Sequence, residues 1–128
     1  MSIITINEVD LELDLLDADV VERYEMLNRQ IVEKIKEPKQ YSGLSNADAM
    51  RIQCRYIDEF FDELFEPGTA ERLFGKGSTF GTRMEGFAIV AAAGQNASNQ
   101  IYAISDKYGI ERVQNRAQRR ASAKAKKK

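Results

Sequence analysis

Carboxylates at helical spacing are the feature of this sequence that comes nearest to a catalytic pattern. The stretch "YIDEFFDELFE", residues 56–66, places Asp58, Glu59, Asp62 and Glu63 three and four positions apart, so pairs share one face of a helix. Two close carboxylates divide acid and base roles only where burial separates their pKa values. These four alternate with apolar residues and should lie on the solvated flank. We therefore expect an acidic surface, with docking of a basic partner as the alternative.

The sequence lacks the residues that other common catalytic centres require. The chain contains no histidine, which removes the usual general base near neutral pH, the serine and cysteine triads and imidazole metal sites. Its one cysteine, Cys54, cannot form an intrachain disulfide or a cysteine cluster for zinc. It falls on an apolar helical stripe and is predicted to be a small core residue. We predict a protein that is not an enzyme and needs no cofactor.

A glycine-rich stretch, "FGKGSTFG", superficially resembles a phosphate-binding loop. The Walker pattern needs a glycine five positions before the Gly-Lys pair and Ser or Thr after it, but position 70 is Ala70 and Lys76 precedes Gly77. A dinucleotide fingerprint also fails, because Phe80 stands where its third glycine is required. The stretch is predicted to be a flexible link before a helix cap.

Charge is distributed unevenly along the chain, although the formal net charge is only −1. Residues 1–66 carry 7 Lys and Arg against 16 Asp and Glu, whereas residues 67–128 carry 12 against 4. The basic end, residues 113–128, has three interpretations: a flexible solubilising tail, an arm that meets the acidic half of a neighbour, or a nucleic-acid contact. The last is less favoured, because the tail offers little aromatic surface for base stacking and no readout motif precedes it. The candidate contacts are Arg116, Arg119, Arg120, Lys126, Lys127 and Lys128.

These residues must be positioned by a small, mainly helical fold. Apolar and acidic residues alternate in "VDLELD", which predicts a strand that pairs with "IITI" through a turn at Asn7-Glu8. Helical stripes follow, with caps expected at Asp17 or Asp19, at Ser45, and at Ser78 or Thr79. We expect the last helix to use an inner face of Phe80, Met84, Phe87, Ala88 and Ala91, and to weaken after Gly94. The predicted fold is mainly α with a small N-terminal β-hairpin (α+β). It is a compact bundle of about three helices in one domain, residues 1–112, with the hairpin at about 2–14 and a basic, flexible tail at 113–128.

Phenylalanines concentrate around residues 60–74, and Tyr56 and Phe60 lie to one side of the stripe that Phe61 defines. Such a cluster is usually core, and that is the favoured interpretation; the alternative is a partial interface, because this helix is apolar over a wider arc than a small domain need cover. An uncovered aromatic patch is a docking surface. The partner-binding candidates are Tyr56, Phe60, Phe65 and Phe74.

The chain shows no membrane span of roughly 20 apolar residues and no basic region followed by an apolar run at its N-terminus, so we expect a cytoplasmic protein without membrane contact.

Two stretches carry a family resemblance. "INEVDLELDLLDADVVERYE" and "FFDELFEPGTAERLFG", with the ending "NRAQRRA", resemble the tail assembly chaperones of long-tailed phages and prophages of Gram-positive bacteria. The resemblance covers residues 6–75 and the tail. It departs at the hairpin turn, which is often Asn-Gly in such proteins and is Asn7-Glu8 here.

The resemblance implies a non-enzymatic role in tail morphogenesis. Such chaperones bind the tape measure protein and tail-tube subunits in the host bacterial cytoplasm and are not components of the mature virion. They often have a longer form made by ribosomal frameshifting. Because lysine codons are adenine-rich, the codons of the three closing lysines could form the run on which the ribosome slips. We also expect a weak homo-oligomer whose association is sensitive to salt through the basic arm.

Overall fold

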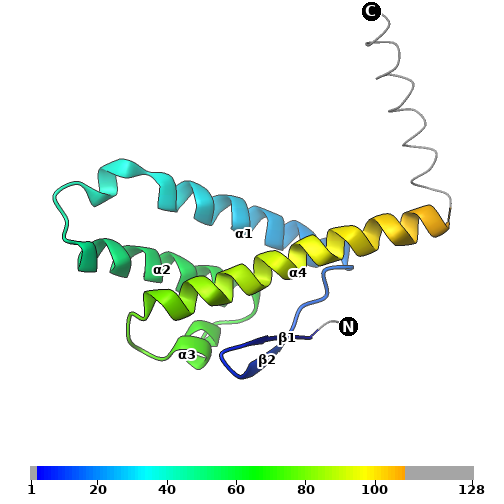
Figure 1. Cartoon of the computed structure of the whole chain (residues 1–128), viewed down its shortest axis with the longest axis horizontal. Coiled ribbons are helices and arrows are strands. Elements are labelled where there is room, and N and C mark those ends of the chain that lie inside the picture. Colours follow the sequence, from blue (N-terminus) through cyan, green and yellow to red (C-terminus); the bar gives the residue numbers. More distant parts are fainter. Residues whose placement is uncertain (1–2, 109–128) are drawn as a thin grey trace, which may run out of the picture. The chain divides into compact units, whose positions relative to one another are not determined.

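The computed structural model describes residues 3–108 and confirms a mainly helical fold with an N-terminal hairpin (Figure 1). In chain order the elements are β1 (Ile3–Ile6), β2 (Val9–Glu12), α1 (Ala18–Lys36), the 3-10 helix η1 (Pro38–Tyr41), α2 (Asn46–Leu64), α3 (Thr69–Phe74) and α4 (Phe80–Lys107).

The two strands pair antiparallel, in the register that the alternation predicts. Ile4 lies opposite Leu11, and Ile6 opposite Val9, so the turn consists of Asn7 and Glu8. Both turn residues have positive φ angles, 49° and 68°. A type I′ turn requires this at its two central positions, and it matches the twist of the strands. The Asn7 side chain also donates to the carbonyl of Leu73, 2.6 Å away, which ties the turn to α3.

Caps fix the ends of the two long helices that follow the hairpin. The Asp17 carboxylate accepts hydrogen bonds from the backbone of Asp19 and Val20, and the Ser45 hydroxyl accepts from Asp48. These side chains satisfy N–H groups that have no partner within the helix. Of the two predicted α1 caps, Asp17 is therefore the correct one. α1 and α2 run antiparallel beside each other, joined through η1 (Figure 1).

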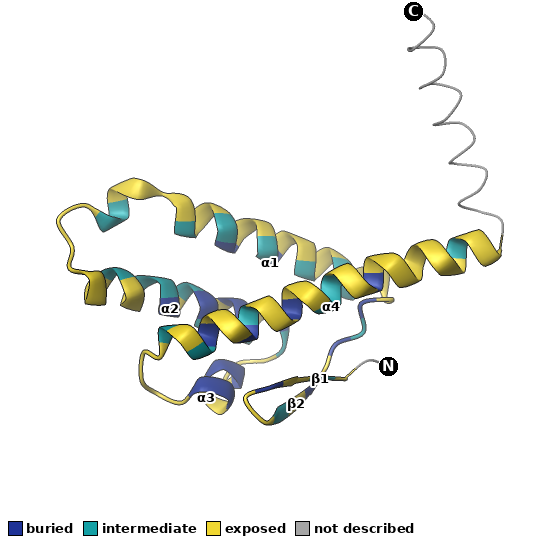
Figure 2. Cartoon of the chain, in the orientation of Figure 1, coloured by how far each residue is buried: buried dark blue, intermediate teal, exposed yellow. Residues whose placement is uncertain are grey.

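The core lies where α2, α3, the hairpin and the first half of α4 meet (Figure 2). Phe61 is fully buried and forms edge contacts with Phe60 and Phe74, at ring-centroid distances of 5.5 and 5.3 Å. α4 comes close enough at Gly86 that a Cβ there would lie 2.8 Å from Phe74. The absence of a side chain at Gly86 thus allows α4 to contact α3 and the hairpin.

The predicted inner face of α4 is correct for Phe80 and Phe87, which are half-buried, and wrong for its other three residues. Met84, Ala88 and Ala91 are exposed, whereas Arg83 and Val90 are buried. α4 is apolar on most sides, so periodicity alone cannot orient it. A buried arginine decides which face points inward. α4 also continues without a break through Gly94 to Lys107.

Internal contacts divide the chain into two compact units after Ala93. The first contains the hairpin, α1, α2, α3 and the start of α4. The second begins at Gly94 and contains the remainder of α4. One domain over residues 1–112 stays a prediction.

Candidate protein-binding surfaces

Two of the four aromatic candidates belong to the core. Phe60 is 3% exposed and Phe74 is 8% exposed. The Phe60 ring contacts Phe87 of α4 edge-on at 5.1 Å, and the Phe74 ring lies 5.2 Å from the Arg83 guanidinium. Their assignment to a surface patch is therefore wrong, because packing between α2, α3 and α4 uses both rings. The core interpretation of the cluster is correct for these two.

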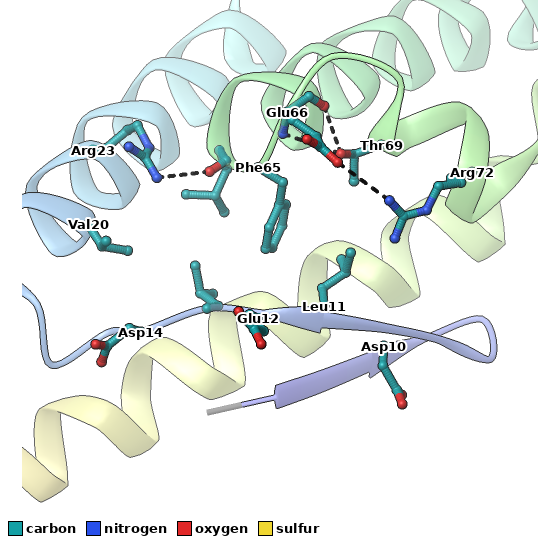
Figure 3. Close-up of a pocket in the computed structure, with 12 residues that line it drawn as sticks. Asp10, Leu11, Glu12, Asp14, Val20, Arg23, Phe65, Glu66, Thr69 and Arg72 are labelled. Carbon is teal, nitrogen blue, oxygen red and sulfur yellow. Dashed lines mark hydrogen bonds and ion pairs between the residues drawn. The ribbon is translucent and has the colours of Figure 1, made fainter. Parts of the chain in front are cut away.

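The other two aromatic candidates are half-buried. The Tyr56 hydroxyl donates to Gln40, and the Lys34 ammonium lies 5.8 Å from the centre of its ring. The Phe65 ring stacks on Phe61 with an interplanar angle of 10° and lines an open cleft (Figure 3). Contact of Tyr56 or Phe65 with a partner stays a prediction.

The four carboxylates within residues 58–63 of α2 divide into a structural pair and a solvated pair. Asp58 and Asp62 are half-buried, and each holds another element in place. Asp62 accepts from the backbone N–H of Ala70 at 2.8 Å, which caps α3 where Gly68 offers no side chain. The expected solvated face is thus confirmed for Glu59 and Glu63, which are exposed, and wrong for Asp58 and Asp62.

Asp58 binds the most buried charge in the described part of the chain. The Arg83 side chain is 2% exposed, and its Nε donates to Asp58 Oδ1 at 2.7 Å while Nη2 donates to Oδ2 at 3.3 Å. Arg83 Nη1 also donates to the hydroxyl and the carbonyl of Thr79. A bidentate pair of this kind fixes both side chains, so its role is to join α4 to α2.

An open cleft of about 400 Å³ lies between residues 10–14 and the neighbouring parts of α1, α2 and α3 (Figure 3). Arg23 donates across it to the Leu64 carbonyl at 3.1 Å, and Arg72 pairs with Glu66 at 3.6 Å. The cleft combines an apolar floor with four carboxylates and two arginines, an arrangement that can hold a cationic side chain. Its lining residues are Asp10, Leu11, Glu12, Leu13, Asp14, Val20, Arg23, Leu64, Phe65, Glu66, Thr69 and Arg72.

Cys54 lies in the core, as predicted, and is 2% exposed. Burial raises the pKa of its thiol, and Asp58 adds to this while Arg83 opposes it. The thiol therefore stays protonated and unreactive near neutral pH.

α4 carries a surface that the sequence reasoning missed. Residues 86–105 contain no charged side chain, in a chain of which 30% is charged. In the second unit, Ile101, Tyr102 and Ile104 are 40%, 60% and 46% exposed. Depletion of charge together with exposed large apolar side chains is typical of the centre of protein interfaces, so this part of α4 is a candidate binding surface. The charge-free run was visible in the sequence and could have revealed this surface.

Residues 3–108 contain neither a membrane-spanning helix nor a metal-binding cluster of side chains. These residues contain no helix long and apolar enough to span a bilayer. Nor do they bring three or more Asp, Glu or Cys side chains together as a metal site. The predicted tail contacts, Arg116, Arg119, Arg120 and Lys126–Lys128, lie outside the described residues.

Comparison with known proteins identifies a family but no function. No curated protein and no solved structure matches the chain. A family model described as "Family of unknown function (DUF6673)" matches residues 7–123, which is most of the chain. The protein therefore belongs to the DUF6673 family of unknown function.

Proposed function

We propose that this protein is a non-enzymatic assembly chaperone that binds a long helical partner, in the manner of the phage tail assembly chaperones that its sequence resembles. The proposed partner is the tape measure protein, with tail-tube subunits as the second component. Binding takes place in the host cytoplasm, and the chaperone leaves before the virion is complete.

The observation that carries the proposal is the uncharged, apolar surface of α4. Ile101 and Ile104 lie three positions apart and are both exposed, so they form one apolar stripe on the helix. A partner helix that packs on this stripe removes apolar area from water and desolvates no charge. Such pairing is the usual mode by which an amphipathic helical segment is recognised.

Charge would provide a second, separable component of binding. The acidic half of the chain and the basic residues after α4 attract opposite partners, and this attraction weakens as salt screens it. Contact through the stripe of Ile101 and Ile104 should persist at high salt, because residues 86–105 hold no charge. Removal of residues 113–128 should therefore reduce the salt dependence and leave the apolar contact.

The direct test is co-expression with the tape measure protein encoded in the same gene cluster. The variant carries Ile101→Glu and Ile104→Glu, which place two charges on the stripe. We expect at least roughly tenfold less co-purified partner, because each buried unpaired charge costs several kcal/mol. Met26→Glu is the matched control, since Met26 lies on α1 with a similar exposure of 47%. Equal recovery with both variants, each verified as folded by circular dichroism, would contradict the proposal.

A further inference from the structure

A second cleft, between the first part of α2 and the loop that joins α3 to α4, differs in charge from the first. It has a volume of about 470 Å³, within the range of small-molecule sites. One wall comes from the start of α2 and the residue Leu44 before it, and the other from the loop between α3 and α4. The lining residues are Leu44, Asp48, Arg51, Ile52, Cys54, Arg55, Asp58, Lys76, Gly77 and Ser78.

Each of the two carboxylates of this cleft has an arginine partner. Asp48 accepts from Arg51 at 2.9 Å in an exposed pair, and Asp58 holds the buried Arg83. Arg55, four positions after Arg51 on the same face of α2, has no hydrogen bond or ion pair with any described residue. Its guanidinium is therefore a cation without a carboxylate partner among these residues.

The loop wall supplies further donors. Lys76 reaches Glu71 only at 3.8 Å with both side chains exposed, a pair of little strength. The Gly77 and Ser78 backbone N–H groups and the Ser78 hydroxyl donate to no described group. The cleft thus combines groups that proteins use to bind phosphate oxygens: arginine, lysine, a hydroxyl and free backbone amides.

The remaining wall is apolar. Leu44 is 40% exposed, Ile52 is half-buried, and Cys54 is buried behind them. A bare anion would leave this side of the cleft empty. A phosphate attached to a flat or apolar body would contact both the cationic wall and the apolar wall of the cleft.

We propose that this cleft binds a phosphate monoester of mononucleotide size, with the phosphate at Arg55, Lys76 and Ser78 and the organic body against Leu44 and Ile52. The site does not include Ile101 or Ile104 and does not depend on the proposed chaperone role. The loop holds the phosphate through side chains and amides of the cleft and needs no Walker motif.

The test is titration of the isotope-labelled full-length chain with adenosine 5′-monophosphate, observed by NMR. We expect saturable shifts confined to the Gly77 and Ser78 amides and the Arg55 side chain. Arg55→Gln should weaken binding by roughly tenfold, the value of one charge-assisted contact. Arg29→Gln is the matched control, because it removes the same charge from an exposed position on α1.

Three ligand arms distinguish the outcomes. Adenosine without phosphate should not bind, and inorganic phosphate should bind more weakly than the nucleotide. Phosphate that binds as tightly as the nucleotide, or equal effects of the two arginine variants, would overturn the proposal. A single-stranded oligonucleotide that shifts the same amides at lower concentration than the nucleotide would also overturn it, in favour of nucleic acid.

Discussion

The bond between Arg83 and Asp58 predicts an unequal response to the loss of either partner. Arg83 is 2% exposed at its side chain, whereas Asp58 is 34% exposed. Asp58→Asn keeps the shape of the side chain but leaves a buried cation without its counter-charge. Arg83→Met removes the cation, fills most of its volume and leaves a carboxylate that water can reach.

The expected magnitudes follow from burial. Removal of one partner of a buried ion pair costs about 3–5 kcal/mol, and the partial exposure of Asp58 places Asp58→Asn at the low end, about 3 kcal/mol. Arg83→Met should cost about half of that. Both are large beside a total stability of about 5–15 kcal/mol. Asp48→Asn is the surface control, since its pair with Arg51 is more than half exposed and should contribute about 0–1 kcal/mol.

The assay is urea unfolding followed by circular dichroism at low and high salt. The m-value should stay unchanged while the midpoint falls, and the loss in Asp58→Asn should vary little with salt because the pair is shielded. A cost below about 1 kcal/mol for Asp58→Asn would refute the reasoning. A larger cost for Arg83→Met than for Asp58→Asn would refute it as well.

Three further substitutions test local features. Glu8→Gly should raise the stability by about 1 kcal/mol, because Glu8 has a φ of 68° that glycine adopts without strain; a lower melting temperature would count against the turn. Gly86→Ala should cost about 1–3 kcal/mol through overpacking against Phe74, whereas Gly81→Ala, with open space around its Cα, should not destabilise α4. Burial raises the pKa of Cys54, so the contribution of its protonated thiol to stability is complete below about pH 8.5 and is lost as the pH rises through the higher pKa of the folded state. Between pH 7 and pH 10, the free energy of unfolding in urea should therefore fall more for the native chain than for Cys54→Ala.

Local signals in the sequence predicted much of the first unit. The alternation around Leu11 determined the strand register, and Asp17 and Ser45 marked helix starts, because each signal acts within a few residues. The Asn7-Glu8 turn was predicted without glycine and occurs with both residues at positive φ.

α4 shows where such signals are insufficient. Its orientation depends on Arg83, whose burial is possible only because Asp58 comes from another helix 25 positions earlier. A prediction from apolar periodicity places arginine on the surface. The predicted inner face of α4 was therefore rotated about the helix axis, away from Arg83. Gly94 did not end the helix, since one interior glycine costs only about 1 kcal/mol. The burial of Phe60 and Phe74 depends on the same contacts with α4.

The central claim, that α4 is the partner-binding element, is tested most directly by hydrogen exchange of the full chain alone and in complex with the co-expressed tape measure protein. Peptides from residues 94–107 should gain protection on binding, and peptides from α1 should not. Protection confined to α1 or the hairpin, with residues 94–107 exchanging as in the free chain, would contradict the claim.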